Sequence, residues 1–378
     1  MGVARRIGGS DPTSTARGGS PRNGRPDGST GRSSHSGMLS ADVGLDLGTA
    51  SVIVYVRGRG IVLQEPSVVA IDEERQQVLA IGQAAREMLG RTPGPIVAIR
   101  PLRNGVVAHY QVTELMLRYF LRKALGGWHL SRPRLVACVP SAVTDVERRA
   151  IAEACRQAGA REVHLISEPM AAAIGAGLDV EEPVGNMVVD VGGGTTDVAV
   201  ISLGSEVVAD SVRVAGDAMD EAVVRYLKRQ HNLIIGERSA EDLKMELGTV
   251  DPEGPVDIPP REVRGRDAVT GLPRTQMVEA EEIRAALMEP AMSIVDAVRR
   301  VLERTPPELA ADIYERGVVM TGGGALLRGL DRLLSQQTGL PVQIAEDPVT
   351  CVARGTGKVL DLLHRNRHAS TTPARRVV

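Results

Sequence analysis

Apolar residues in this chain gather into short runs that glycine-rich turns interrupt. One run covers residues 41–46 and leads into Gly48 and Thr49, and a second covers residues 51–56 and continues into the apolar stretch 61–63. Short apolar runs bounded by glycine are typical of buried strands. The pattern predicts a strand, a tight turn and a second strand.

The same unit occurs again about 144 residues later. An apolar run at 187–191 leads into a Gly/Thr turn at 192–197, and another apolar run follows at 198–203. In both copies an aspartate, Asp46 or Asp190, ends the first strand just before the turn. We interpret this as an internal duplication that gives two similar lobes facing each other across a cleft.

Helix signals lie between and after these units. Thr144 and Glu147 have capping-box spacing and predict a helix that ends near Gly159. Glu168 and the proline after it begin an alanine-rich helix, since proline is tolerated at a first helical position.

A third glycine-rich turn, residues 322–324, follows the apolar run 318–320. We expect it to open a helix with one apolar face, formed by Leu326, Leu327, Leu330, Leu333 and Leu334. Strands that alternate with helices indicate an α/β fold in layers.

Composition agrees with two lobes. A chain of 378 residues exceeds what one hydrophobic core usually supports. Only seven residues are aromatic, so the core must consist of Val, Ile, Leu, Ala and Met, which suits buried parallel strands. We expect these parts: a disordered basic tail at 1–38, lobe I at 39–185 with an insertion at about 67–108, lobe II at 186–336 with a subdomain at about 218–286, a return to lobe I at 337–361, and a basic tail at 362–378.

Charge is unevenly distributed along the chain. The two terminal segments carry ten arginines and two acidic residues, which leaves 35 basic and 45 acidic residues in the body. The first segment is rich in Gly, Ser, Arg and Pro, with too few apolar residues to offset the entropy of ordering. The acidic body and the scarcity of aromatic residues argue against a nucleic-acid-binding module.

The spacing of the cysteines and the lengths of the apolar runs indicate the cellular compartment of the protein. Cys138, Cys155 and Cys351 are odd in number and widely spaced, which fits neither a disulfide framework nor a zinc site. There is no apolar run of eighteen residues and no apolar stretch of a secretory signal at the N-terminus. We therefore expect a cytoplasmic protein.

The two acid-ended hairpins carry the candidate chemistry. A nucleoside triphosphate needs backbone amides, hydroxyls and a metal ion around its phosphates, and glycine permits close approach of the backbone. Asp46 and Asp190 would meet near Mg²⁺, which one or two carboxylates and phosphate oxygens typically hold. One such hairpin alone is better explained as a β-turn, but two copies and a third Gly-rich turn favour the nucleotide site. The sequence lacks a GxxxxGK[ST] motif, and no acidic-ended strand follows residues 322–324 as in a Rossmann fingerprint.

Several segments together resemble the bacterial actins MreB and Mbl over roughly residues 41–361. They are DLGTASVIVYVRGRGIVLQEPSVVAI, VPSAVTDVERRAI, EPMAAAIGAGL, GNMVVDVGGGTTDVAVISLG, AGDAMDEAVV and ERGVVMTGGGALLRGLDRLL. The resemblance implies an actin-like ATPase fold with duplicated, ribonuclease H-like lobes around a nucleotide cleft. It also implies ATP and Mg²⁺ as cofactors.

The resemblance assigns roles by position. Asp46 and Asp190 are implied metal ligands, and Glu168 would orient the attacking water with the help of Thr195. The implied nucleotide contacts are Gly48, Thr49, Ala50, Gly192, Gly193, Gly194, Thr195, Thr196, Glu241, Lys244, Gly322, Gly323, Gly324 and Ala325.

Glu168 has a chemical reason for its role, because phosphoryl transfer to water needs a polar group that positions the nucleophile. The alternative is a helix-cap carboxylate that interacts with the helix dipole. Glu147 is the competing acid, to which we give mainly a capping role. The first turn departs from the family's DLGTANT, because Ser51 and Val52 replace Asn and Thr. A phosphate-facing amide and hydroxyl are therefore expected to be missing, and we expect a slow ATPase.

The resemblance also implies partners. Trp128 and Leu130 lie in a stretch similar to the apolar loop with which MreB proteins touch the inner membrane, and tryptophan favours that interface. The alternative for Trp128 is that it covers the edge of the core. The arginine-rich tails would add attraction to anionic lipid or remain solvated. Head-to-tail self-assembly into filaments and contact with the cell-wall synthesis machinery follow from the resemblance alone.

Two alternatives within the superfamily stay open. A chaperone of the heat-shock class would need a peptide-binding domain beyond the nucleotide lobes, for which we expect the chain to be too short. A sugar or acetate kinase would need an acceptor pocket and a catalytic base that the sequence does not identify.

Overall fold

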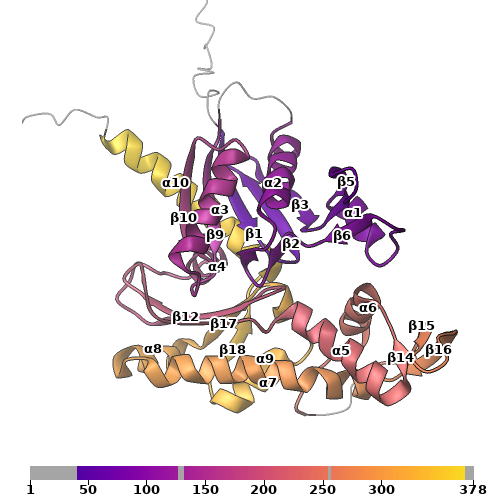
Figure 1. The fold of residues 1–378 in the computed structure, drawn as a ribbon. Helices are drawn as coiled ribbons and strands as arrows, with labels where there is room; N and C mark the ends of the chain where they lie inside the picture. Colours follow the sequence, from indigo (N-terminus) through magenta and orange to yellow (C-terminus); the bar gives the residue numbers. More distant parts are fainter. Residues whose placement is uncertain (1–40, 127–131, 254–256, 371–378) are drawn as a thin grey trace, which may run out of the picture. The chain divides into compact units, whose positions relative to one another are not determined.

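The structure is a computed structural model that describes residues 41–126, 132–253 and 257–370, and these residues form two lobes (Figure 1). Lobe I contains a five-stranded sheet in the order β10-β9-β1-β2-β3, made of β1 (Asp42–Leu47), β2 (Ser51–Val56), β3 (Gly60–Pro66), β9 (Arg134–Val139) and β10 (Glu162–Ser167). Lobe II contains a five-stranded sheet in the order β13-β12-β11-β17-β18, made of β11 (Asn186–Val191), β12 (Thr196–Ser202), β13 (Ser205–Val212), β17 (Val318–Thr321) and β18 (Val342–Ile344).

The two sheets have the same topology. In each, the first three strands form an antiparallel meander, and two further strands extend the sheet in parallel from the first strand. The strands β1 and β11 therefore occupy the same central place in their lobes. This confirms the duplication that the sequence predicts.

Strand alternation decides which side chains face the junction of the lobes. In β1, Val43, Leu45 and Leu47 lie in the core of lobe I, and in β11 the residues 187, 189 and 191 lie in the core of lobe II. Successive side chains of a strand point to opposite faces of its sheet. Asp46 and Asp190 therefore point out of the two cores.

Helices cover both sheets (Figure 1). In lobe I these are α2 (Tyr110–Leu125) and α3 (Asp145–Gln157) on one face, with α4 (Glu168–Ala176) and α10 (Cys351–Ser370) against the other. In lobe II they are α5 (Gly216–His231), α6 (Glu237–Leu247), α7 (Ala280–Arg304), α8 (Pro307–Arg316) and α9 (Leu330–Thr338), with short 3₁₀ helices η1 (Gly323–Leu326) and η2 (Pro348–Thr350). The predicted capping box of α3 is present, since the Glu147 amide and the Thr144 hydroxyl, and the Thr144 amide and the Glu147 carboxylate, are hydrogen-bonded.

Each lobe also carries a small sheet. In lobe I it has the order β5-β4-β6, made of β4 (Val69–Asp72), β5 (Gln77–Ile81) and β6 (Ile96–Ile99). The helix α1 (Gln83–Met88) lies between β5 and β6 in the chain, and the ribbon of β7 (Leu102–Arg103) and β8 (Val106–Val107) follows β6. In lobe II it has the order β14-β15-β16, made of β14 (Leu233–Ile234), β15 (Arg261–Asp267) and β16 (Pro273–Val278). The small sheets lie within the segments 67–108 and 218–286 that the sequence marks as insertions.

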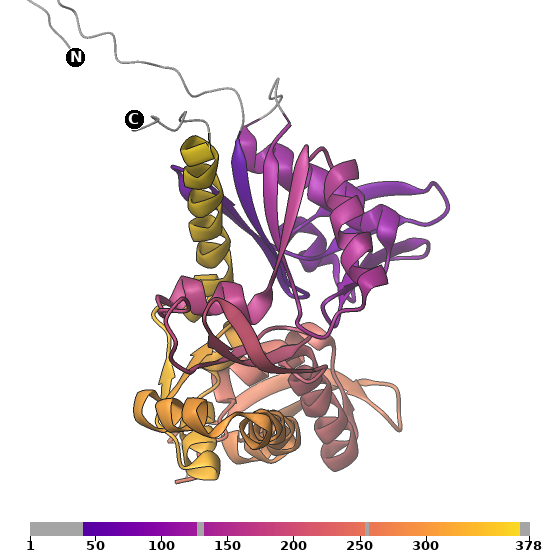
Figure 2. The same cartoon turned by 90° about the vertical axis from the view of Figure 1, so that its left-hand side faces the viewer.

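The helices α4 and α10 pack closely where the lobes join (Figures 1 and 2). A Cβ atom on Gly175 would lie 1.8 Å from the Cys351 carbonyl oxygen, and one on Gly355 would lie 1.9 Å from that of Ala171. A third hydrophobic cluster, which includes Ala171 and side chains of β9, β11 and β12, fills the space beside this crossing. The crossing needs glycine because the two backbones touch.

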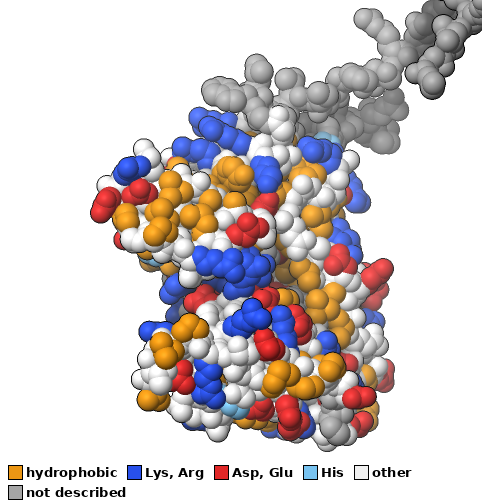
Figure 3. Space-filling view, turned by 90° about the vertical axis from the view of Figure 1, so that its right-hand side faces the viewer, with side chains coloured by type: hydrophobic (Ala, Val, Ile, Leu, Met, Phe, Trp, Pro, Cys, Tyr) orange, Lys and Arg blue, Asp and Glu red, His pale blue; other side chains and the backbone are white. Residues whose placement is uncertain are grey.

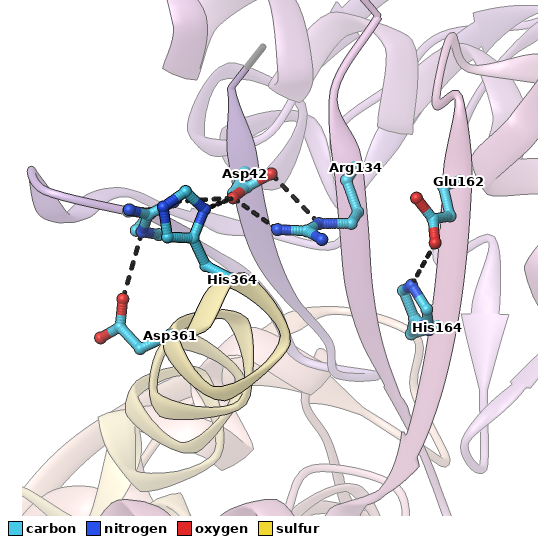
Figure 4. A network of polar contacts seen from close by, with 7 residues as sticks. Asp42, Arg134, Glu162, His164, Asp361 and His364 are labelled. Carbon is cyan, nitrogen blue, oxygen red and sulfur yellow. Dashed lines mark hydrogen bonds and ion pairs between the residues drawn. The ribbon is translucent and has the colours of Figure 1, made fainter. Parts of the chain in front are cut away.

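A polar network fixes the other end of α10 to the sheet of lobe I (Figure 4). The buried Asp42 accepts hydrogen bonds from Arg134 at 2.7 and 3.2 Å and from Arg57 at 3.0 Å. Arg57 also pairs with Asp361 of α10 at 3.2 Å, and His364 Nδ1 lies 4.0 Å from Asp42. Because a buried carboxylate needs such partners, the start of β1 and the last turns of α10 are held together.

Three expectations about the C-terminal third differ from the structure. The helix predicted to open at residues 322–324 begins only at Leu330, because Gly329 has a φ of +77° and separates it from η1. Leu326 is consequently 59% exposed rather than part of the apolar face. The segment 337–361 returns to lobe I only after β18, which pairs with β17 of lobe II. Helix α10 continues to Ser370, into the segment predicted as a tail.

The predicted tail at 1–38 lies outside the described residues. Among the helices described, none is both long enough and apolar enough to span a bilayer.

Candidate functional site

The first glycine turn joins β1 to β2 and is held by a serine. The Ser67 hydroxyl donates to the Gly48 carbonyl at 2.6 Å, and the Ser67 amide donates to the Ala50 carbonyl at 3.0 Å. A Cβ atom on Gly48 would lie 2.7 Å from the Ser51 carbonyl oxygen, so the turn has room only for glycine.

The second glycine turn joins β11 to β12 and is tied to the start of α5. The Gly192 amide donates to the Thr195 carbonyl at 2.9 Å, which closes the turn. The amides of Gly216 and Asp217 donate to the carbonyls of Gly192 and Gly193 at 3.2 and 2.7 Å. The N-terminus of α5 therefore supports this turn.

The two turns face each other across the junction of the lobes. A Cβ atom on Gly193 would lie 2.7 Å from the Cβ of Ala50, and one on Gly194 would lie 2.5 Å from the Thr49 hydroxyl. The same hydroxyl accepts from the Gly105 amide at 3.2 Å. The hairpins of the two lobes are thus brought together as the duplication predicts.

The third glycine turn lies against the second. Gly322 has a φ of +80°, and a Cβ atom on it would lie 2.3 Å from the Val191 carbonyl oxygen. The residue before it, Thr321, donates its hydroxyl to Asp190 Oδ1 at 2.7 Å. This turn therefore sits beside the carboxylate that ends β11.

All three turns line one cavity of about 780 Å³. The residues predicted for the site that line it are Asp46, Gly48, Thr49, Ala50, Glu168, Asp190, Gly192, Gly193, Gly194, Thr195, Glu241, Lys244, Gly322, Gly323 and Gly324. Side chains from both lobes thus border a single space large enough for a nucleotide-sized ligand.

Two of the residues predicted for the nucleotide site, Thr196 and Ala325, are not part of this lining. The Thr196 hydroxyl donates to the Val214 carbonyl at 2.7 Å, so it is used inside lobe II. Ala325 is buried in the core of lobe II. Trp128 and Leu130 lie outside the described residues.

Asp46, Glu168 and Asp190 line the cavity with raised pKa values, and burial is the main cause of each shift. Burial and the charge of Asp190 raise the pKa of Asp46 to about 8. Burial raises the pKa of Asp190 to about 7, with the hydrogen bond from Thr321 acting against it. The pKa of Glu168, at the start of α4, is raised well above its ordinary value by burial and then by Asp197, Asp190 and Asp46. These groups are costly to ionise together in the absence of a cation.

The departure from the family motif at residues 51 and 52 has a smaller effect than expected. Ser51 lines the cavity, so a polar residue still stands where the family motif has Asn. Val52 points into the core of lobe I and is fully buried. The replacement of Thr by Val at this position therefore changes the core rather than the cavity.

Sequence reasoning missed six charged residues of the lining, among them Arg86, Arg100, Asp217 and Asp220. Arg86 pairs with Glu241 at 2.6 Å, Arg100 pairs with Asp217 at 3.3 Å, and Asp220 pairs with Lys244 at 2.8 Å. The two arginines lie in the inserted segment of lobe I, where no motif marks them. The two aspartates lie in AGDAMDEAVV, a segment used for the resemblance but without a role assigned.

Comparison with known proteins identifies the family. Residues 40–368 match the family described as MreB/Mbl protein. The chain belongs to the MreB/Mbl family. It is 53% identical to the cell shape-determining protein Mbl of Bacillus cereus, over 87% of this chain and 98% of the relative, and 54% identical to the cell shape-determining protein MreB of Escherichia coli, over 86% and 95%.

Solved structures agree with the MreB/Mbl assignment. MreB5 of Spiroplasma citri, solved with ADP and with AMPPNP, is 36% identical and superimposes with a TM-score of 0.83 over 88% of this chain and 99% of that one. MamK in its double helical filament, 21% identical with a TM-score of 0.72, shares the fold. The predicted actin-like fold is confirmed.

We expect the stability of this MreB/Mbl chain, free of metal and nucleotide, to fall as the pH rises from 6 to 8.5. Asp46 and Asp190 have folded-state pKa values of about 8 and about 7, above the ordinary value of 3.8. Between the ordinary pKa and the folded-state pKa of each group, the folded state binds more protons than the unfolded state. The free energy of unfolding therefore decreases with rising pH. Urea unfolding in the presence of EDTA at a series of pH values measures this free energy of unfolding.

Asp46→Asn and Asp190→Asn should each flatten this decrease, because a neutral amide has no proton to lose. Asp267→Asn is the control, since hydrogen bonds from Thr270 and Val269 lower the pKa of this carboxyl to about 2. It should leave the slope between pH 6 and 8.5 unchanged. If both Asp46→Asn and Asp190→Asn kept the wild-type dependence of the free energy of unfolding on pH, the raised pKa values of these two residues would be contradicted.

Proposed function

We propose that this chain binds ATP with Mg²⁺ in the cavity between its lobes, hydrolyses it slowly and assembles into filaments that organise cell-wall synthesis and cell shape. The observation that carries the proposal is that both acid-ended glycine hairpins line the same cavity. Spiroplasma citri MreB5, which has the same fold, was solved with ADP and with AMPPNP, and this similarity supports nucleotide binding here.

The backbone of the three turns suits a polyphosphate. Gly193, Gly194 and Gly323 line the cavity without a side chain that could cover their amides, whereas the Gly322 amide donates to the Pro348 carbonyl at 2.9 Å. Amides exposed in this way bind phosphate oxygens without a charged side chain. The hydroxyls of Thr49 and Ser51 add polar groups from lobe I.

The charge of the cavity favours a divalent cation. Seven acidic side chains and only four basic ones line it: Asp46, Glu65, Glu168, Asp190, Asp217, Asp220 and Glu241 against Arg86, Arg100, Lys244 and Arg328. A triphosphate alone would be repelled by this excess of negative charge. Among the described residues, no three His, Cys, Asp or Glu side chains form a metal site by themselves. The pair Asp46 and Asp190 therefore fits an ion such as Mg²⁺, which takes its remaining ligands from phosphate and water.

Glu168 and Thr195 are proposed to act on the attacking water. Both line the cavity from opposite lobes, Glu168 at the first turn of α4 and Thr195 at the end of the second glycine turn. Phosphoryl transfer requires mainly that the nucleophile be oriented and that charge be stabilised. Mg²⁺ when bound supplies the positive charge, and the side chains of Glu168 and Thr195 would hold the water. The raised pKa of Glu168 lowers the fraction of this side chain that is ionised at neutral pH, and this supports the proposal of slow turnover.

Glu168→Gln should lower the rate of phosphate release from ATP by roughly a hundredfold, the lower range for loss of a positioned acid–base group. Binding of ATP should persist, because the turns are unchanged. Phosphate release under single-turnover conditions and ATP affinity by calorimetry measure the two effects. Glu147→Gln is the matched control, since Glu147 caps α3 and does not line the cavity. Equal rates in Glu168→Gln and wild type would remove Glu168 from the reaction.

Assembly and membrane contact are proposed from the family. Relatives about half identical to this chain are named cell shape-determining proteins. ATP that contacts both lobes would favour a closed form whose ends match for head-to-tail contacts, and hydrolysis would relax it. Trp128 and Leu130 are proposed to touch the inner face of the plasma membrane, where a tryptophan ring is favoured.

Electron microscopy with Mg-ATP and anionic vesicles tests this part of the proposal. Wild-type protein should form filaments on the vesicles, whereas Asp190→Ala should form none because it loses a proposed metal ligand. Trp128→Ala should form filaments that do not attach to vesicles. Identical behaviour of all three proteins would overturn both assignments.

A further inference from the structure

Two ion pairs connect the small subdomain of lobe I to lobe II across the mouth of the cavity. Arg86 of α1 lies 2.6 Å from Glu241 of α6, measured from Nη2 to Oε2. Arg100, which follows β6, lies 3.3 Å from Asp217 of α5, measured from Nη1 to Oδ1. All four residues line the cavity, so the pairs border the space that the ligand would occupy.

Arg86 is presented from a fixed position. The Glu65 carboxylate of β3 accepts a hydrogen bond from the Gln83 amide at the start of α1 at 2.9 Å. It accepts a second hydrogen bond from Lys123 of α2 at 2.5 Å. Ala85 is buried against the small sheet. The helix that carries Arg86 is thereby attached to the main body of lobe I.

Glu241 and Asp217, the partners in lobe II, also have their surroundings fixed by hydrogen bonds and ion pairs. Lys244, one turn after Glu241, is engaged by Asp220 at 2.8 Å and by the Gly216 carbonyl at 3.0 Å. Glu241 therefore pairs across the cleft and not with the lysine on its own helix. The Asp217 amide donates to Gly193, which connects the second ion pair to a glycine turn.

The surface view shows the same arrangement. Lys and Arg side chains gather along the lower edge of the upper lobe, directly above Asp and Glu side chains of the lower lobe (Figure 3). The side chains of Arg86 and Glu241 are 32% and 25% exposed. An ion pair with this exposure contributes a modest free energy that salt reduces.

We propose that Arg86–Glu241, supported by Arg100–Asp217, is a latch that sets the rate at which nucleotide leaves the cavity. This inference rests on the proposed nucleotide site. A nucleotide held between the lobes leaves when α1 and α6 separate, and this separation breaks both pairs. The latch would thus control exchange without taking part in hydrolysis.

Release of a fluorescent N-methylanthraniloyl-ADP, chased with excess ATP, tests the latch by charge reversal. Arg86→Glu and Glu241→Arg should each accelerate release about three- to tenfold, because charge reversal replaces the attraction of an exposed pair with a repulsion of similar size. The double variant Arg86→Glu/Glu241→Arg restores an attractive pair and should return the rate to within about twofold of wild type. Arg75→Glu is the matched control, because Arg75 is 77% exposed in the same subdomain and does not line the cavity.

Salt provides an independent readout. Raising the ionic strength should accelerate release from wild type more than from Arg86→Gln, which keeps only the Arg100–Asp217 pair. This neutral variant also replaces Arg86→Glu if the latter fails to fold. Fast release in both single variants without recovery in the double variant would mean that Glu241 acts on the nucleotide directly, and this would overturn the latch. Unchanged rates in every variant would do so as well. Failure of the wild type to bind the fluorescent ADP would instead reject the proposed nucleotide site.

Discussion

The burial of two carboxylates, one from each lobe, beside a single cavity is the constraint on which this structure depends. Asp46 and Asp190 end equivalent strands in the two lobes, and both point out of their cores toward the junction. Burial raises the pKa of both groups, and the charge of Asp190 adds to the shift of Asp46 as that of Asp197 adds to the shift of Asp190, so the folded chain without a cation carries a penalty at neutral pH. A bound cation would relieve that penalty, and this makes the cavity suited to a metal-bound polyanion.

The rest of the fold serves to hold these two groups in place. Each lobe supplies a strand whose alternate residues pack its core, and each closes the strand with a turn in which glycine is required by contact. The crossing of α4 and α10 joins the lobes so closely that backbone meets backbone. Because α4 also carries Glu168 at its first turn, the joint between the lobes and the proposed catalytic residue belong to one element.

Local chemistry was predictable from the sequence wherever a short segment determines its own structure. The duplicated hairpins, the capping box of α3 and the Pro-started α4 depend on neighbouring residues, and they occur as predicted. The sequence could not give Arg86–Glu241, because these residues are 155 positions apart and their contact depends on how the lobes close. The start of α9 was missed because Gly329 adopts a positive φ within an otherwise helical pattern. The cavity lining was overestimated at Thr196 because strand alternation turns its hydroxyl toward Val214.

The central claim is that Asp46 and Asp190 act together on one divalent cation beside the triphosphate. Calorimetric titration of ATP into wild type, Asp46→Asn, Asp190→Asn and the double variant, each with Mg²⁺ and with EDTA, tests it most directly. The account predicts that Mg²⁺ strengthens binding to wild type at least about tenfold, that either substitution removes most of this gain, and that the double variant loses little more, because groups sharing one ion are not additive. Retention of the full Mg²⁺ effect in either single variant, or independent and additive losses in the double variant, would contradict it.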